Sequence, residues 1–165
     1  MPYYVIIRGP LGSGKSTVAA RLSKTLKGRH ISIDRILASH GLEDDHEDGY
    51  ISQKSFVKAN AIAAARAKKI MKSNIPVVFD GNFYWKSQIE DLIDRMDCRH
   101  YTFTLKAPLR LCIARDSMRK KPLGKKATAM VFKKTTSFDY GIGIDATRTV
   151  ECITKEMLSH CNSKR

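Results

Sequence analysis

The sequence predicts an α/β protein with a doubly wound, five-stranded parallel sheet, helices on both faces and a short basic lid. Short β-rich runs alternate with segments of helical periodicity, which is the pattern of this class. The first β-rich run leads directly into a glycine-rich loop that opens a helix. A length of 165 residues suits one hydrophobic core, and neither a repeat nor a linker interrupts the pattern. We therefore expect a single domain over residues 1–165.

Five short runs rich in branched and aromatic residues are predicted to form the strands. In chain order they lie at residues 3–8, 30–33, 75–79, 99–105 and 141–144. The first three are followed by Gly9, Asp34 and Asp80. The run at 75–79 is apolar on both faces, as expected of a parallel strand that helices cover on both sides.

The helices are predicted from apolar residues spaced three and four positions apart. They lie at residues 15–27, 53–72, 89–96, 109–118, 128–134 and 150–158. Gly28 can stop the first helix, and Thr149 is a candidate N-cap for the last. The acidic stretch from Asp34 to Gly49 is expected to be a loop. The stretch from Arg119 to Lys126, punctuated by Gly and Pro, should be mobile within a lid over about residues 115–134.

The strongest motif is the loop after the first strand. It reads Gly9-Pro10-Leu11-Gly12-Ser13-Gly14-Lys15-Ser16 and fits G-x-x-x-x-G-K-[ST]. Such a loop wraps backbone N–H groups around phosphate oxygens, and side chains at its glycines would collide with the anion or the backbone. We expect Lys15 to contact the β- and γ-phosphates of a nucleotide and the Ser16 hydroxyl to bind Mg²⁺. The predicted nucleotide-binding residues of this segment are Gly9, Leu11, Gly12, Ser13, Gly14, Lys15, Ser16 and Thr17.

Two carboxylates follow strands whose carboxyl ends meet at one edge of the sheet, where ligands bind in open α/β folds. Asp34 could accept the proton of an attacking hydroxyl, or it could cap the helical turn that starts at Arg35. Asp80 could hold Mg²⁺ through water, or it could be an ordinary turn residue. The aromatic residues Phe83 to Trp85 come next and could form either the floor of a substrate pocket or part of the core.

The positive charge of the chain is concentrated rather than spread. The formal net charge is +14, and residues 106–134 contain ten Lys or Arg against Asp116 alone. This balance favours anionic partners, either nucleic acid or anionic metabolites. Within the lid, Arg115, Arg119, Lys120 and Lys121 could stabilise a transferring phosphate, and we expect one or two of the four to do so. The alternative is a solvated basic surface.

Composition also limits the other classes of function. The four cysteines lie far apart without a zinc-binding spacing, so free thiols are expected. The apolar runs are much shorter than the roughly 20 residues of a membrane span. We therefore expect no membrane partner and a cytoplasmic location.

Together, these residues resemble the nucleoside-monophosphate-kinase-like group of P-loop kinases. Within that group the chain is most similar to adenylylsulfate kinase, chloramphenicol phosphotransferase and polynucleotide kinase. The likeness spans most of the chain and rests mainly on the glycine loop. More moderate signals are 33–35, 78–81, 107–116 and 143–147. The resemblance implies a P-loop fold that uses ATP and Mg²⁺, with Asp34 as the base, Arg115 and Arg119 as lid arginines, and Arg148 near the adenine. Residues 41–50 match no substrate signature.

The predicted function is transfer of the γ-phosphoryl group of ATP to a hydroxyl of a small molecule, expected to be anionic. A second interpretation makes the acceptor the 5′-hydroxyl of a polynucleotide or nucleoside, which the positive charge favours. A third is an ATPase or nucleotide-dependent switch without an acceptor. The identity of the acceptor, the preference for ATP over GTP and the oligomeric state stay open at this point.

Overall fold

The computed structural model describes residues 2–163 and contains one five-stranded parallel sheet of order β2-β5-β1-β6-β7. The elements, in chain order, are β1 (Tyr4–Arg8), α1 (Lys15–Thr25), β2 (Arg29–Ser32), α2 (Ile33–Ser39), β3 (His46–Glu47), β4 (Tyr50–Ile51), α3 (Gln53–Met71), β5 (Val77–Gly81), α4 (Lys86–Met96), β6 (His100–Lys106), α5 (Leu109–Ser117), α6 (Lys125–Thr135), β7 (Ile142–Asp145) and α7 (Val150–Asn162). The predicted fold class, including the five parallel strands, is confirmed.

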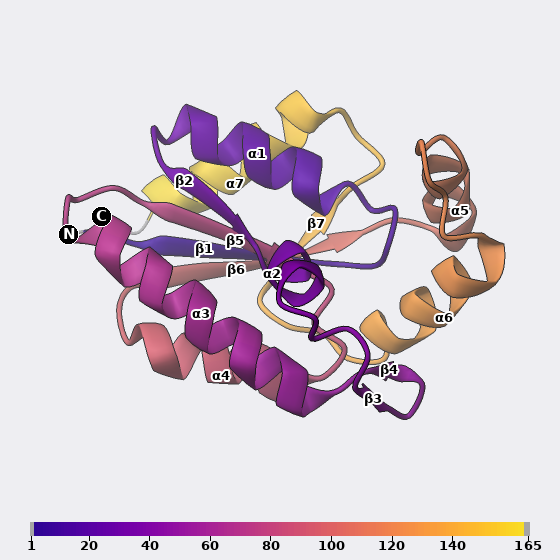
Figure 1. Cartoon of the computed structure of the whole chain (residues 1–165). Coiled ribbons are helices and arrows are strands. Elements are labelled where there is room, and N and C mark those ends of the chain that lie inside the picture. Colours follow the sequence, from indigo (N-terminus) through magenta and orange to yellow (C-terminus); the bar gives the residue numbers. More distant parts are fainter. Residues whose placement is uncertain (1, 164–165) are drawn as a thin grey trace.

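Helices cover both faces of the sheet, as Figure 1 shows: α1 and α7 lie on one face, and α3 and α4 on the other. The central strand β1 supplies both layers because successive side chains of a strand point to opposite faces. Tyr4 and Ile6 pack in the core on the α3 and α4 side, whereas Val5 and Ile7 pack on the α1 and α7 side. All five residues of β1 are buried, so the loop that follows begins at a strand that is packed on both faces.

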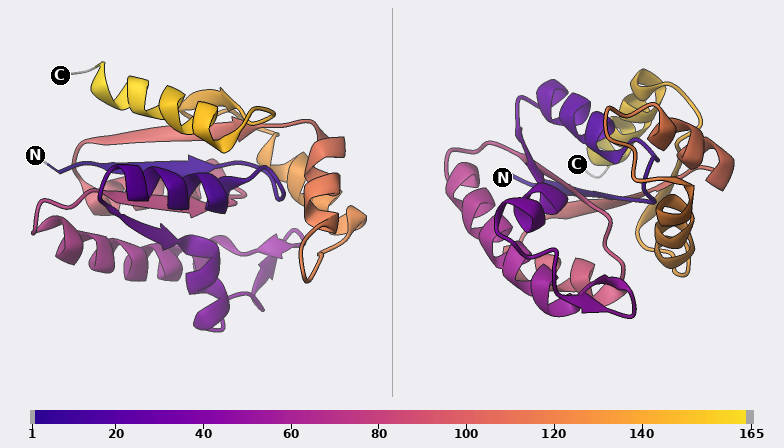
Figure 2. Two further views of the ribbon diagram at one scale, coloured as in Figure 1. Left: turned by 90° about the horizontal axis from the view of Figure 1, so that it is seen from above. Right: turned by 45° about the vertical axis from the view of Figure 1, so that its right-hand side comes forward.

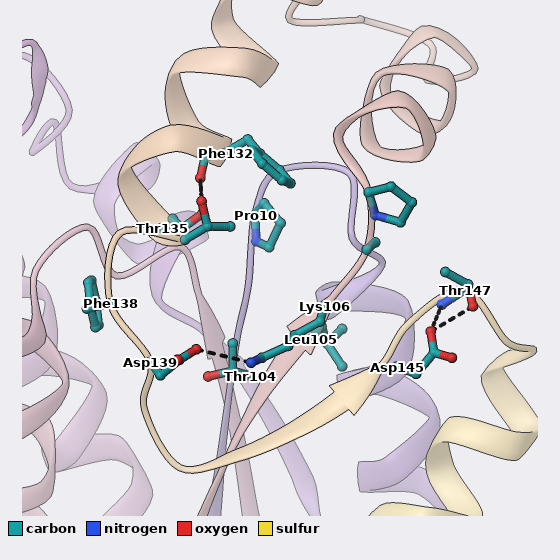
Figure 3. Close-up of a pocket in the computed structure, with 13 residues that line it drawn as sticks. Pro10, Thr104, Leu105, Lys106, Phe132, Thr135, Phe138, Asp139, Asp145 and Thr147 are labelled. Carbon is teal, nitrogen blue, oxygen red and sulfur yellow. Dashed lines mark hydrogen bonds and ion pairs between the residues drawn. The ribbon is translucent and has the colours of Figure 1, made fainter.

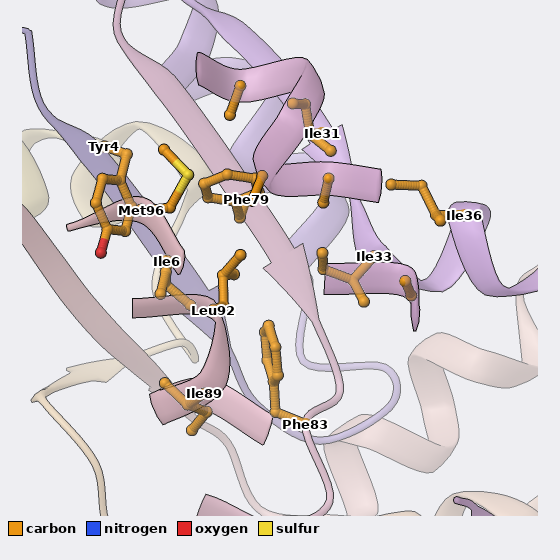
Figure 4. Packing of buried hydrophobic residues seen from close by; sticks show 14 of the residues in the cluster. Tyr4, Ile6, Ile31, Ile33, Ile36, Phe79, Phe83, Ile89, Leu92 and Met96 are labelled. Atoms are coloured by element: carbon orange, nitrogen blue, oxygen red, sulfur yellow. The ribbon is translucent and has the colours of Figure 1, made fainter. Parts of the chain in front are cut away.

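The core on the α3 and α4 side is built from long apolar and aromatic side chains (Figure 4). Phe79 of β5 makes an edge contact with Tyr4 of β1, with 5.8 Å between the ring centres. Leu92 and Met96 of α4 complete this layer. Burial of each such side chain contributes about 1.5–3 kcal/mol, which favours the register that places these residues inward.

The segment between β2 and α3 differs from the predicted loop. It contains the helix α2 and a small antiparallel hairpin of β3 and β4. The hydroxyl of Ser32 caps α2 by accepting a hydrogen bond from the Arg35 amide at 3.3 Å. Asp34 therefore lies inside the first turn of α2, and its alternative interpretation as the N-cap is wrong.

The helices α5 and α6 extend beyond the carboxyl ends of the strands (Figure 2). Asp116, which is buried, accepts hydrogen bonds from the amides of Leu123 and Gly124 at 3.2 and 2.9 Å. These bonds tie the start of α6 to the end of α5, and α6 begins at Lys125, three residues before the predicted start at Thr128. The predicted mobility of residues 119–126 stays a prediction.

A membrane-crossing helix is not found within residues 2–163, where every helix is too short or too polar to span a bilayer.

Candidate active site

The glycine-rich loop joins β1 to α1 at the carboxyl edge of the sheet. Gly12 and Gly14 have φ angles of +80° and +94°, a region that L side chains rarely adopt. Gly14 is the N-cap of α1. In the described structure no side chain caps this helix, and its first turn contains no acidic residue. The first amides of α1 and the positive end of its dipole are therefore available to an anion.

Gly12 is packed against the backbone of α5. A Cβ atom built at Gly12 would lie 2.3 Å from the carbonyl oxygen of Cys112. Contact this close with backbone cannot be relieved by a rotamer change, so the loop itself would have to move. The sequence motif predicts a glycine here, but the reason found in the structure is a contact with a residue one hundred positions later.

A Gly12→Ala variant is therefore expected to weaken binding of magnesium nucleotide by about tenfold or more, the equivalent of about 1.4 kcal/mol. It should also lower the melting temperature, because both the strained φ and the collision with Cys112 act on the folded state. Calorimetry and thermal denaturation measure the two effects.

The matched control is Gly41→Ala. Gly41 also has a positive φ, +64°, but in the part of the chain that the structure describes no atom lies within 4 Å of the place that a Cβ atom would take there. If both variants lose the same number of degrees in melting temperature, the φ angle alone, rather than the contact with Cys112, explains the requirement for glycine at position 12.

Lys15 and Ser16 follow the loop and turn toward the neighbouring strand. The Nζ atom of Lys15 donates a hydrogen bond to the Pro10 carbonyl at 3.2 Å, and the side chain is almost fully buried. Burial lowers the pKa of Lys15, while the nearby Asp34 and Asp80 carboxylates oppose that change. The Ser16 hydroxyl donates to Asp80 Oδ2 at 2.9 Å. The structure thus brings the loop and the predicted metal ligand of β5 together.

The oxygen atoms of Ser16 and Asp80 fit a hard cation. Asp80 is fully buried at the end of β5, one oxygen faces the Ser16 hydroxyl, and the other contacts Nε2 of His30. Carboxylate and hydroxyl oxygens are ligands that Mg²⁺ accepts. His30 was missed by the sequence interpretation because no motif marks it. Only the pairing of β2 with β5 brings it beside Asp80.

A cavity of about 390 Å³ lies on the α2 side of the loop. Lys15, Asp34 and Asn82 are among its lining residues. The backbone amide of Asn82 donates to Asp34 Oδ1 at 3.4 Å. Burial raises the pKa of Asp34 to about 6, which the positive charge of Lys15 counteracts and the negative charge of Asp80 reinforces. Asp34 is therefore a carboxylate whose basicity is increased beside the loop lysine.

The aromatic residues after β5 have three different roles. Phe83 is fully buried in the core against Phe56, whereas Tyr84 lines the 390 Å³ cavity and its hydroxyl accepts a hydrogen bond from Asn82 at 3.2 Å. Trp85 contacts α6, because the ammonium group of Lys134 in that helix lies 4.3 Å from the centre of its ring. Phe83 is therefore a core residue, whereas Tyr84 belongs both to the buried core and to the lining of this cavity.

A second cavity, of about 360 Å³, lies on the α7 side of the same loop. Gly12 to Gly14, Thr17, Arg115 and Arg148 are among the residues that line it. Arg115 donates to the carbonyls of Ser13 and Ala146 at 3.0 and 2.9 Å, so it joins the loop to the segment after β7.

Of the two predicted lid arginines, only Arg119 lies beside both cavities in the described structure. It lines both the 360 Å³ and the 390 Å³ cavity, and its charge contributes to the lowered pKa of Lys15. Arg148 lines only the first of these and also pairs with Glu156. Lys120 and Lys121 are absent from both linings in the described structure. Arg119 is thus a cation at the junction of the two cavities, beside the glycine loop.

A third cavity, of about 410 Å³, lies between Pro10, the ends of β6 and β7, and the C-terminal end of α6 (Figure 3). Phe132, Thr135 and Phe138 line it on the α6 side, and Thr104 on the β6 side. None of the site residues predicted from the sequence is in this lining, although Pro10 of the glycine-rich loop is.

Comparison with known proteins identifies the family and the fold. Residues 5–138 match the family described as AAA domain. Similar solved structures include a gluconokinase from Sinorhizobium meliloti (15% identity, TM-score 0.69, covering 96% of this chain and 90% of that chain). A sugar kinase from Janibacter has 13% identity, a TM-score of 0.76 and coverage of 96% and 94%. Shikimate kinase from Aquifex aeolicus has 17% identity, a TM-score of 0.64 and coverage of 96% and 95%. At these identities the likeness shows the fold alone. No curated protein matches the sequence significantly.

Proposed function

The chain belongs to the AAA domain family and has a P-loop kinase fold, and from this premise we propose that it transfers the γ-phosphoryl group of ATP to a hydroxyl of a small molecule. The observation that carries the proposal is the 390 Å³ cavity beside the loop, where Asp34 and Lys15 line the same space as Arg119. A protein that only hydrolyses ATP needs no cavity for an acceptor beside the phosphate loop.

In the proposed reaction the acceptor oxygen forms a bond to the γ-phosphorus, and the bond from that phosphorus to the bridging oxygen of ADP breaks. The hydroxyl proton passes to the Asp34 carboxylate. Lys15 and Arg119 stabilise the negative charge on the transferring group. When bound, Mg²⁺ would add positive charge at the β- and γ-phosphates. Ser16 would hold it directly, and Asp80 would hold it through water.

The 360 Å³ cavity is the proposed site of the nucleoside part of ATP. Its lining joins the loop to Arg115 and Arg148, and these residues are proposed to contact the adenosine end of the nucleotide. With the nucleoside on this side of the loop, the γ-phosphate would lie toward Arg119 and the acceptor cavity. The two cavities are therefore assigned to donor and acceptor in the same proposal.

The charges in the acceptor cavity support an anionic small molecule. Three cations, Lys15, Arg35 and Arg119, line it against two carboxylates, Asp34 and Glu43. Hydrogen-bonding groups of Ser32, Asn82 and Tyr84 are also in the lining. A guanidinium group binds carboxylate or phosphate well, because its N–H groups match the geometry of both anions.

A cytoplasmic location is part of the proposal and is supported by four cysteines that are all free thiols.

A nucleic-acid 5′-hydroxyl is the second candidate acceptor. Within residues 2–163, none of the nine Lys and Arg residues between positions 110 and 134 forms an ion pair. This basic segment lies next to the acceptor cavity, because Arg119 belongs to both. Unpaired cations of this density suit a polyanion.

The test is transfer of label from γ-labelled ATP to pools of small hydroxylated metabolites and, separately, to short DNA and RNA oligonucleotides. We expect labelling of an anionic metabolite that changes little between about 50 and 200 mM salt. Labelling of oligonucleotides that falls by orders of magnitude over that range would favour the second candidate instead. Tight binding of magnesium ATP with slow hydrolysis and no labelled acceptor would overturn the kinase proposal in favour of a switch.

A further inference from the structure

Arg8, the last residue of β1, is a fully buried cation directly before the glycine loop. Its Nη2 atom donates to the Thr135 carbonyl at 2.6 Å, and its Nη1 atom donates to Thr104 Oγ1 at 3.2 Å. The guanidinium carbon lies 4.2 Å from the centre of the Phe138 ring. In the part of the chain that the structure describes, Arg8 forms no ion pair, and its Nε atom has no hydrogen-bond partner.

A helix end supplies the carbonyl that accepts the hydrogen bond of Arg8 Nη2. Burial lowers the pKa of Arg8 to about 10, and the negative charge of Asp139 opposes that change, so the group stays cationic at neutral pH. Thr135 is the last residue of α6, and the carbonyls at the C-terminal end of a helix carry partial negative charge. Burial of a charge is costly unless such partners are held firmly in place. The arrangement therefore favours a position of α6 in which its C-terminal end lies against Arg8 of β1.

Arg8 is one of the connections between the sheet and the C-terminal end of α6. The 410 Å³ cavity lies between Phe132 and Thr135 of α6 and the loop residue Pro10 (Figure 3). Two hydrogen-bond partners of Arg8, Thr104 and Thr135, line this cavity, as does Phe138. Because empty space interrupts the apolar packing here, the bonds of Arg8 connect the helix to the sheet across the edge of the cavity.

The other end of α6 is joined to Arg119. Asp116 accepts hydrogen bonds from the amides of Leu123 and Gly124, which lead into α6. Residues 117–124 include Arg119, the cation at the junction of the two cavities. A chain of contacts therefore runs from the start of the glycine loop through α6 to Asp116, and the amide of Arg119 donates to the Asp116 carbonyl at 3.0 Å.

We propose that Arg8 is a positioning residue that couples the glycine loop to the lid by holding the C-terminal end of α6 on β1. Through α6 it sets the place of Arg119 over the group being transferred. This inference rests on the proposed phosphoryl transfer, and it adds a residue outside both cavities to that function.

Trp85 offers a direct reporter of the position of α6. It is the only tryptophan of the chain, and the Lys134 ammonium of α6 lies 4.3 Å from its ring centre. Tyr50 also holds α6, because its hydroxyl donates to the Met130 carbonyl at 3.0 Å. A change in the position of α6 should therefore change the fluorescence of Trp85, and no acceptor is needed for this measurement.

The experiment compares Arg8→Met and Arg8→Lys with the wild type. We expect magnesium ATP to change Trp85 fluorescence in the wild type and to change it by less than half as much in Arg8→Met. With the acceptor found in the labelling screen, kcat should fall by about 10- to 100-fold, the scale expected for a misplaced catalytic group. The Kd for magnesium ATP, measured by calorimetry, should change by less than about threefold. Arg8→Lys should recover part of both losses, because an ammonium keeps the charge and at least one donor.

Arg21→Met is the matched control, since Arg21 is an exposed arginine of α1. It should leave fluorescence, kcat and Kd unchanged. If Arg8→Met does not fold, Phe138→Leu replaces it, and we expect smaller losses in the same direction because the ring contact with Arg8 is lost. A wild-type fluorescence response and kcat in folded Arg8→Met would overturn the proposal, as would a wild-type protein that binds magnesium ATP without any response of Trp85. Failure of the wild type to bind magnesium ATP would instead overturn the kinase proposal itself.

Discussion

Replacement of Lys15 by methionine is expected to lower phosphoryl transfer by about 10³-fold or more while the protein stays folded. Methionine keeps most of the aliphatic stem, so the nearly buried site loses a charge rather than its packing. The Lys15 side chain lines the acceptor cavity beside Asp34, and the negative charges of Asp34 and Asp80 both act on it. Its loss would remove one of the cations that line the space proposed for the transferring group. Initial rates with γ-labelled ATP at saturating acceptor measure the effect, with thermal denaturation as the test of folding.

Lys24→Met is the control for the general loss of positive charge. Lys24 is exposed in the last turn of the same helix, at the end away from the glycine loop. Its replacement should leave the rate unchanged. A Lys15→Met protein that turns over at the wild-type rate would contradict the assignment of the glycine loop as the phosphate site.

Replacement of Asp34 by asparagine is the second large effect. The rate of transfer should fall by about 10²- to 10⁴-fold, because an amide cannot accept the proton of the acceptor hydroxyl. Binding of magnesium ATP should be nearly unchanged, since Asp34 lines the acceptor cavity rather than the 360 Å³ cavity. Calorimetry of nucleotide binding and the labelling assay separate the two quantities. Wild-type turnover in the variant would contradict the assignment of Asp34 as the base.

The pH dependence gives an independent test of the same carboxylate. Burial raises the pKa of Asp34 to about 6, so the group is ionised above that pH and protonated below it. A base must be ionised to accept a proton, and kcat/KM should therefore be level above about pH 6 and fall about tenfold per pH unit below it. The Asp34→Asn variant should lack this step. Asp44→Asn, which changes an exposed carboxylate of the neighbouring acidic segment, should keep the wild-type profile.

Much of the fold could be predicted from the chain alone because its signals are local. The alternation of strands and helices follows from apolar spacing within short windows, and the five strands and the main helices lie within a few residues of their predicted positions. The region from Ile33 to Ile51 was the exception. There α2 has only seven residues and the hairpin strands have two each, so neither is long enough to show a period.

The candidate site was only partly predictable, because some of its residues form a contiguous motif and others meet only through the order of the strands. The loop from Gly9 to Ser16 is a contiguous motif, and its place between a strand and a helix is confirmed. Asp34 and Asp80 were predicted from their positions after strands, whereas the contacts of Asp80 with Ser16 and His30 depend on β5 lying between β1 and β2. No spacing in the sequence encodes that order.

The phosphate loop, the class of fold and the concentration of positive charge in the lid can all be read from the linear chain, since each depends on residues that are close together in it. Three further features emerge only from the folded arrangement: Arg119 lies at the junction of two cavities, Gly12 packs on Cys112, and the end of α6 accepts a hydrogen bond from Arg8. These contacts join residues roughly one hundred positions apart. Their physical cause is the close packing of the whole domain, in which the place of each side chain depends on all the layers around it.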